Sequence, residues 1–132
     1  MLRILLLLVI FLSGPVGSAV AGAAVTVVRH LKGYECMAVK LTPAEMMNPS
    51  AMVPIFSAPS STSPKLGIAG VVVAVRYPPV NRNEFTEVLF PSGVLGWVET
   101  ERLKPWVAAP GTNGECHPAL LSNGRIGFDY VQ

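Results

Sequence analysis

The sequence contains few of the residues that most often carry enzyme chemistry. It has two cysteines and two histidines in 132 residues, and the cysteines are not in a C-x-x-C spacing. Cys116 and His117 are neighbours, and adjacent residues rarely present a nucleophile and its base in the required geometry. A thiol mechanism at this pair is therefore disfavoured, and we expect no catalytic residues and no enzyme activity.

Charge is also scarce, and neither sign dominates. Charged residues make up 14% of the chain, with 10 Lys and Arg against 8 Asp and Glu. One of the basic residues, Arg3, belongs to the N-terminal leader discussed next. Nucleic-acid binding depends on clustered Lys and Arg, so the sequence predicts no nucleic-acid partner.

No apolar run is long enough to cross a bilayer. The run at residues 4–12 is well short of the roughly 20 residues that a membrane-spanning helix needs. Arg3 precedes it and small residues follow at 13–24, an order typical of a secretory signal. We therefore expect a signal helix within residues 1–23, cleaved near Ala21 to Ala24, and a periplasmic or secreted protein. The alternative is an uncleaved anchor, and the membrane would be contacted only through that segment.

The two cysteines lie near opposite ends of the expected exported chain, at Cys36 and Cys116. In an oxidising compartment an even pair of cysteines usually forms a disulfide. This bond would close most of the exported chain into one loop and hold the C-terminal tail in place. A free reactive or metal-binding thiol is the alternative.

Short extended segments recur between proline-rich and glycine-rich turns, a pattern that predicts an all-β fold. Thr42-Pro43-Ala44-Glu45 interrupts them as the start of a short helical turn, with a Thr N-cap and Pro at the first position. Val71 to Val75 is apolar on both faces, so we expect a fully buried strand. A 3₁₀ turn is expected at 101–105. The expected extended segments are 25–28, 37–41, 53–56, 71–75, 85–90 and 94–100.

The regular spacing of these strands favours a small barrel or sandwich. We place this domain at residues 37–106, and a linker with a C-terminal tail at 107–132. The tail contains one plausible turn at 122–125.

One hairpin gives the domain a family resemblance. Gly93-Val94-Leu95-Gly96-Trp97-Val98 resembles the Gly-x-x-Gly-Trp-Val hairpin of bacterial Src homology 3 domains, with Leu103 and Pro105 in the closing turn. The usual Asn-Val-Arg-x-Gly-Pro motif is replaced by residues 54–59. The resemblance implies a small five-stranded, partly open barrel that binds or packs and catalyses nothing. Trp97 is expected to pack in its core, because large aromatic side chains dominate cores.

The candidate ligand-binding residues are those on loops that carry rings or charge, since such loops often bind. The expected partner is a peptide, either a cell-wall stem peptide or a segment of an envelope protein. Glu99 and Glu101 flank a strand end and are expected to be solvated. The candidate binding residues are Tyr77, Pro79, Arg82, Phe85 and Trp106.

Two other interpretations remain open. The first is a structural or accessory domain with no ligand of its own. The second is a copper-binding protein, because thioethers suit Cu(I) and four methionines lie between Met37 and Met52. Methionines also fill irregular gaps in cores, so we expect no cofactor. These methionines are Met37, Met46, Met47 and Met52.

Overall fold

A computed structural model describes residues 14, 17 and 22–132. The expected signal helix falls mostly outside these residues, as does Ala21, the first residue of the expected cleavage region at Ala21 to Ala24. Of the described residues, 44% lie in strands and 10% in helices, which confirms a mostly β protein. None of the helices in this part of the chain is long and apolar enough to cross a membrane.

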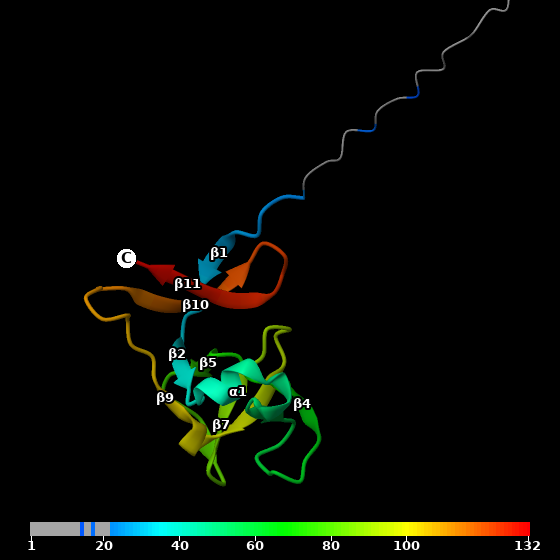
Figure 1. The fold of residues 1–132 in the computed structure, drawn as a ribbon, viewed down its shortest axis with the longest axis vertical. Helices are drawn as coiled ribbons and strands as arrows, with labels where there is room; N and C mark the ends of the chain where they lie inside the picture. The colour runs from blue at the N-terminus through cyan, green and yellow to red at the C-terminus, as the bar shows by residue number, and fades with distance from the viewer. Residues whose placement is uncertain (1–13, 15–16, 18–21) are drawn as a thin grey trace, which may run out of the picture.

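The larger of two sheets is a continuous antiparallel path in the order β4-β3-β8-β7-β5-β2-β9, with the short β6 paired to β7 (Figure 1). The two ends of the path, β4 and β9, are not paired with each other, so the sheet stays open. Its strands are β2 (Tyr34–Val39), β3 (Pro54–Phe56), β4 (Lys65–Ile68), β5 (Val72–Arg76), β6 (Asn81–Arg82), β7 (Phe85–Leu89), β8 (Leu95–Glu99) and β9 (Leu103–Pro105).

The main hydrophobic core lies against this sheet and is built largely from aliphatic side chains. Val75, Val88 and Val98, from β5, β7 and β8, are each less than 2% exposed. The expectation of a buried strand holds for the middle of the segment at 71–75 but is wrong at its start. Val71 is 56% exposed, because it precedes β5 and contributes mainly its carbonyl, which accepts a hydrogen bond from the Val39 N–H.

The β7–β8 hairpin follows the sequence expectation closely. Gly93 closes its turn at φ 87°, a backbone conformation that other residues seldom adopt. A Cβ built on Gly96 would lie 2.5 Å from the Ile55 side chain, so only glycine fits there. Trp97 is 9% exposed and clusters with Phe56 and Phe85, which confirms that it packs in the protein interior.

The segment after this hairpin is more regular than expected. The 3₁₀ turn is η2 (Thr100–Arg102), and residues 103–105, expected to lie within that turn, form β9 instead. Leu103 and Pro105 pair with Val39 and Met37 of β2. Proline is tolerated here because β9 is an edge strand and its missing N–H faces no further neighbour.

The helical turn begins where the capping pattern predicts. In α1 (Pro43–Met47) the Thr42 hydroxyl accepts a hydrogen bond from the Glu45 N–H, and the Glu45 carboxylate accepts one from the Thr42 N–H. A single 3₁₀ turn, η1 (Pro49–Ala51), then leads into β3. The Glu45 carboxylate also pairs with Arg102 of η2 at 2.7 Å, which ties α1 to the closing turn.

A second sheet of three strands lies above the first and was not predicted (Figure 1). It has the order β1-β10-β11, with β1 (Val27–His30), β10 (Glu115–Leu121) and β11 (Ile126–Val131). The expected turn at 122–125 is therefore the loop of a hairpin, and Gly124 has a φ of 79°. The residues expected to form a simple tail thus pair with the start of the described chain.

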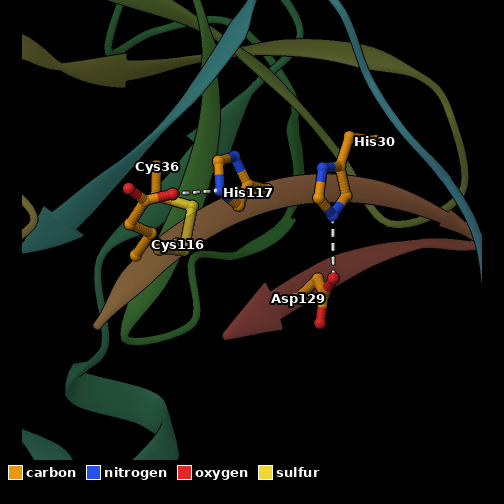
Figure 2. Close-up of a disulfide and its surroundings, with 6 residues drawn as sticks. His30, Cys36, Cys116, His117 and Asp129 are labelled. Carbon is orange, nitrogen blue, oxygen red and sulfur yellow. Dashed lines mark hydrogen bonds and ion pairs between the residues drawn. A yellow bond between two sulfur atoms is a disulfide. The ribbon is translucent and has the colours of Figure 1, made fainter. Parts of the chain in front are cut away.

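The disulfide joins the two sheets covalently. Cys36 of β2 and Cys116 of β10 are bonded, with their Cα atoms 6.0 Å apart (Figure 2). This confirms the expected pairing, and a disulfide is typical of an oxidising, extracytoplasmic environment.

Candidate functional site: an acidic cleft

A cleft of about 600 Å³ lies at one end of β7 and β8. Three glutamates from separate segments line it: Glu84 between β6 and β7, Glu99 at the end of β8, and Glu101 in η2. We call it the acidic cleft. Its full lining is Ser61, Asn81, Glu84, Phe85, Glu99, Thr100 and Glu101.

A strained two-residue turn places the first of these carboxylates. Asn83 and Glu84 join β6 to β7, and both have positive φ, 51° and 66°. Such turns require positive φ at both central positions and usually have glycine at the second. Here a glutamate occupies that position although it is disfavoured there, and its side chain lines the cleft. Residues held in sparsely populated conformations cluster at functional sites, which marks Glu84 as a candidate.

Hydrogen bonds between strands fix the wall of the cleft. The Thr86 hydroxyl lies 2.8 Å from Asn81 Oδ1 and 2.9 Å from the Thr100 hydroxyl. The Thr100 N–H donates to the Glu84 carbonyl, which links η2 to the β6–β7 turn. Thr86 is only 3% exposed, so this small network is rigid. The three glutamates are thus held on a fixed scaffold.

Among residues 22–132, no basic side chain forms an ion pair with the glutamates that line the cleft. Among residues 22–132, the carboxylates that form ion pairs are those of Glu45, Glu87, Glu115 and Asp129, and none of these lines the cleft. The three glutamates of the cleft therefore present uncompensated negative charge. The same part of the chain has no group of three or more His, Cys, Asp or Glu arranged to hold a metal ion.

A smaller cavity of about 140 Å³ adjoins the acidic cleft and shares Asn81 and Thr100 with it. Its lining is mostly apolar and includes Met37, Pro79 and Leu103, with a fourth carboxylate from Glu35. A ligand that spans both cavities would place a cation in one and an apolar group in the other.

The structure separates the residues that the sequence grouped as ligand-binding. Pro79 lines the smaller cavity, and Phe85 lines the acidic cleft while being only 8% exposed. Arg82 lies over the Trp97 ring, with its Cζ 5.8 Å from the ring centre. Tyr77 is 67% exposed and lines neither cavity.

Trp106 lies apart from the others. It is half-buried, with its ring 6.0 Å from that of the exposed Tyr130 on β11. Burial raises the pKa of the Tyr130 hydroxyl above its ordinary value. The aromatic residues therefore do not line one groove.

None of the three glutamates of the cleft was predicted to contact a ligand. Glu99 and Glu101 were expected to be solvated, as the exposed Glu101 is, whereas Glu99 is half-buried; Glu84 was not considered. Two features of the sequence could have pointed to them. Glu84 occupies a position in a tight turn where glycine is usual, and Glu99 and Glu101 closely follow the Gly-Trp pair of the hairpin. Neither observation shows that the three segments meet, because that depends on the pairing of β6, β7 and β8.

The other candidate chemistries have no assembled site in the described chain. Cys116 is in the disulfide, so it offers no thiol, and its neighbour His117 stacks on His30 with ring centres 4.4 Å apart. Each ring bonds through Nε2 to a carboxylate, His30 to Asp129 at 2.7 Å and His117 to Glu115 at 2.9 Å (Figure 2).

The methionines of the copper hypothesis have very different surroundings. Met37 packs against the core, whereas Met46 and Met47 on α1 are 55% and 85% exposed. The copper hypothesis stays a prediction, and the packing of Met37 is what its gap-filling alternative expects.

Comparison with known proteins found no family model, no curated protein and no solved structure that matches this chain.

Proposed function

We propose that the protein is an exported, non-catalytic binding module that recognises peptides through a positively charged group held in the acidic cleft. The single observation that carries this proposal is that Glu84, Glu99 and Glu101, from three segments, line one cleft and form no ion pair among the described residues. A lysine side chain, or the free amine of a cell-wall stem peptide, has the complementary charge.

The order of the strands supports the barrel arrangement that the family resemblance implies. The strands β8, β7, β5, β2 and β9 pair consecutively, and side chains from all five contribute to one core. The 3₁₀ turn η2 lies between β8 and β9, directly before Leu103 and Pro105, which the resemblance assigns to the closing turn. We propose a bacterial Src homology 3-like domain on this basis. Periplasmic or secreted location fits the disulfide and the leader-like N-terminal residues.

Calorimetric titration with matched peptides tests the cleft. We expect the exported protein to bind a short lysine peptide and to bind the same peptide at least tenfold more weakly once its ε-amine is acetylated, because acetylation removes the charge. Affinity for the lysine peptide should fall as salt rises, since exposed charges are screened. Equal binding of both peptides, or of neither, contradicts the proposal.

A triple variant links binding to the cleft. Glu84→Gln, Glu99→Gln and Glu101→Gln together should abolish binding of the lysine peptide and leave the far-ultraviolet circular dichroism unchanged. The matched control is Glu115→Gln, which removes an exposed carboxylate of the smaller sheet, outside the cleft. If the control loses as much affinity as the triple variant, general surface charge explains the binding. A pull-down on cell-wall sacculi and envelope lysate then separates wall peptides from protein partners.

A structural domain with no ligand of its own is the second candidate. The observation in its favour is that Phe85, one of the five residues expected to bind, packs in the buried aromatic cluster, and that Trp106 lies against Tyr130. Absence of binding to the lysine peptide, to sacculi and to envelope proteins would favour this alternative.

A further inference from the structure

The smaller cavity beside the acidic cleft contains a glutamate among largely apolar neighbours. Glu35 of β2 lines this cavity of about 140 Å³. Every second side chain of a strand lies on the same face of its sheet, so Glu35 shares a face with Met37 and Val39. Val39 belongs to the main hydrophobic core, and Met37 packs against it. The Glu35 side chain therefore lies on the core-facing side of the larger sheet.

The strand pairing places aliphatic side chains around this glutamate. Glu35 lies directly opposite Val75 in the β2–β5 ladder, and Val75 is only 1% exposed. Leu103 of β9 lines the cavity as well and is 7% exposed. A group that pairs with the Glu35 carboxylate would therefore have aliphatic side chains beside it.

Glu35 has no partner of opposite charge in the described part of the chain. Its side chain is half-buried, and none of the ion pairs among residues 22–132 includes it. Charged groups that are taken out of water are usually paired, because the surrounding protein screens and solvates them less well. The cavity therefore suits a ligand that supplies one positive charge next to an apolar group.

The volume of the cavity limits the size of this ligand. One water molecule needs about 10–15 Å³, and pockets for drug-sized ligands start at about 300 Å³. A cavity of about 140 Å³ lies between these limits and is of the size of a single small residue.

The cavity and the acidic cleft meet at a polar boundary. Asn81 and Thr100 line both of them, and the buried Thr86 hydroxyl lies between, within hydrogen-bond distance of each side chain. Thr86 donates to Asn81 Oδ1, which leaves the NH₂ group of Asn81 to donate elsewhere. A peptide chain that runs from the cavity to the cleft would pass this amide group.

We propose that the smaller cavity binds the N-terminal residue of a peptide, with its α-ammonium group paired with Glu35 and a small aliphatic side chain against Met37 and Leu103. In an N-terminal valine or alanine the charge and the side chain lie on the same carbon, as a small cavity requires. A lysine ammonium, by contrast, lies at the end of a long stem. The choice of a peptide rests on the proposed function, whereas the site itself is independent of the acidic cleft.

An NMR titration of the exported protein with short peptides that contain no lysine tests this site. We expect Val-Gly-Gly amide to shift the amide signals of residues 35–37 and 103. Acetyl-Val-Gly-Gly amide should bind about tenfold more weakly, because acetylation removes the charge that pairs with Glu35. Phe-Gly-Gly amide should also bind more weakly, since its ring exceeds the cavity. Equal binding of the free and acetylated peptides, or no binding of either, overturns the proposal.

A single substitution links this binding to Glu35. Glu35→Gln should bind Val-Gly-Gly amide about tenfold more weakly and leave the weak binding of the acetylated peptide unchanged. The control is Glu115→Gln, which removes an exposed carboxylate of the smaller sheet and should have no effect. Amide spectra without peptide confirm that both variants are folded. Unchanged affinity in Glu35→Gln, or an equal loss in the control, contradicts the assignment.

Valinamide separates a peptide from a small free amine. It has the same ammonium group and side chain but lacks the chain that would pass Asn81, so it should bind more weakly than Val-Gly-Gly amide. Equal affinity would assign the cavity to small amines and overturn the peptide assignment.

The triple variant of the acidic cleft separates this inference from the proposed function. Glu84→Gln with Glu99→Gln and Glu101→Gln should still bind Val-Gly-Gly amide, and loss of that binding would place the tripeptide in the cleft and overturn the inference. An N-acetylated lysine peptide tests the cleft alone. If that peptide binds and Val-Gly-Gly amide does not, the proposed function stands and this inference fails. The reverse result supports the inference and contradicts the proposed function.

Discussion

Glu84 combines an unfavourable backbone conformation with a side chain that lines the acidic cleft. Its φ of 66° lies in the left-handed region, which costs a residue with a Cβ about 1 kcal/mol and costs glycine little. We therefore expect Glu84→Gly to raise the free energy of unfolding by up to about 1 kcal/mol while weakening binding of a lysine peptide. Urea unfolding and calorimetric titration measure the two effects on the same sample.

Glu84→Gln is the control for this trade-off. It removes the charge but retains the backbone strain, so binding should weaken with no gain in stability. If Glu84→Gly is less stable than the native protein, the strain argument is wrong and the turn is not a compromise between stability and binding.

Gly96 lies so close to its neighbours that no side chain larger than a hydrogen atom fits there. An alanine Cβ there would lie 2.5 Å from Ile55 Cγ2 and 3.2 Å from the Phe56 carbonyl oxygen, and the backbone atom cannot move aside cheaply. We expect Gly96→Ala to lower the free energy of unfolding by about 1–3 kcal/mol, the usual cost of overpacking a core. Gly70→Ala is the matched control, because its closest neighbour is 3.7 Å away. Equal effects of the two substitutions in thermal unfolding would contradict the packing argument.

At the scale of elements, α1 is held by a carboxylate whose protonation can be tested. The hydrogen bond from Arg102, followed by that from the Thr42 backbone, holds the pKa of Glu45 below its ordinary value. A lowered pKa in the folded state stabilises the fold above the unfolded-state pKa of about 4.3 and ceases to do so as the pH falls through the folded-state value. We expect Glu45→Gln to lower the urea midpoint at pH of about 7 and to have less effect at pH of about 3.

The control for this pH dependence is Glu101→Gln, because Glu101 is exposed and forms no ion pair among the described residues. The urea midpoint of this variant should equal that of the native protein at both pH values. If the urea midpoints of Glu45→Gln and the native protein differ by the same amount at both pH values, Glu45 acts only by packing.

The sequence predicts elements well where local chemistry decides them. The capping box at Thr42 and Glu45, the turn ending in Gly93, and the extended segment that becomes β7 each depend on neighbouring residues, and each is confirmed. Prediction from the sequence fails where a strand pairs with a segment that is far away in the sequence. Strand β9 is three residues long and exists because β2 lies beside it, and β1 pairs with β10 near the other end of the chain.

The same reasoning explains the candidate site. Phe85 lines the acidic cleft and Pro79 lines the smaller cavity, and their role in ligand binding stays a prediction. The glutamates could not be grouped from their spacing alone, since Glu84 and Glu99 approach each other only through the Phe85–Glu99 register of β7 and β8. The position of Trp106 beside Tyr130 could not be predicted, because Tyr130 belongs to a strand that was not predicted.

For the whole molecule, the disulfide is the covalent link between the sheets and closes a loop of 80 residues. In the chain-entropy model a loop of this length contributes about 4 kcal/mol. We expect Cys36→Ser with Cys116→Ser to lower the free energy of unfolding by about that amount. Reduction of the native protein is the control, and it should reproduce the effect. A loss below about 1 kcal/mol would show that the sheets hold together without the bond.

The most direct test of the acidic cleft is an NMR titration in which the lysine peptide is added to the exported protein and the backbone amide signals of the protein are recorded. The account predicts that the largest shifts fall at residues 81–86 and 99–101, with smaller ones at Ser61, and that the acetylated peptide leaves these signals unchanged. Shifts concentrated around Tyr77 or Trp106 instead, or no shifts at all, would contradict it.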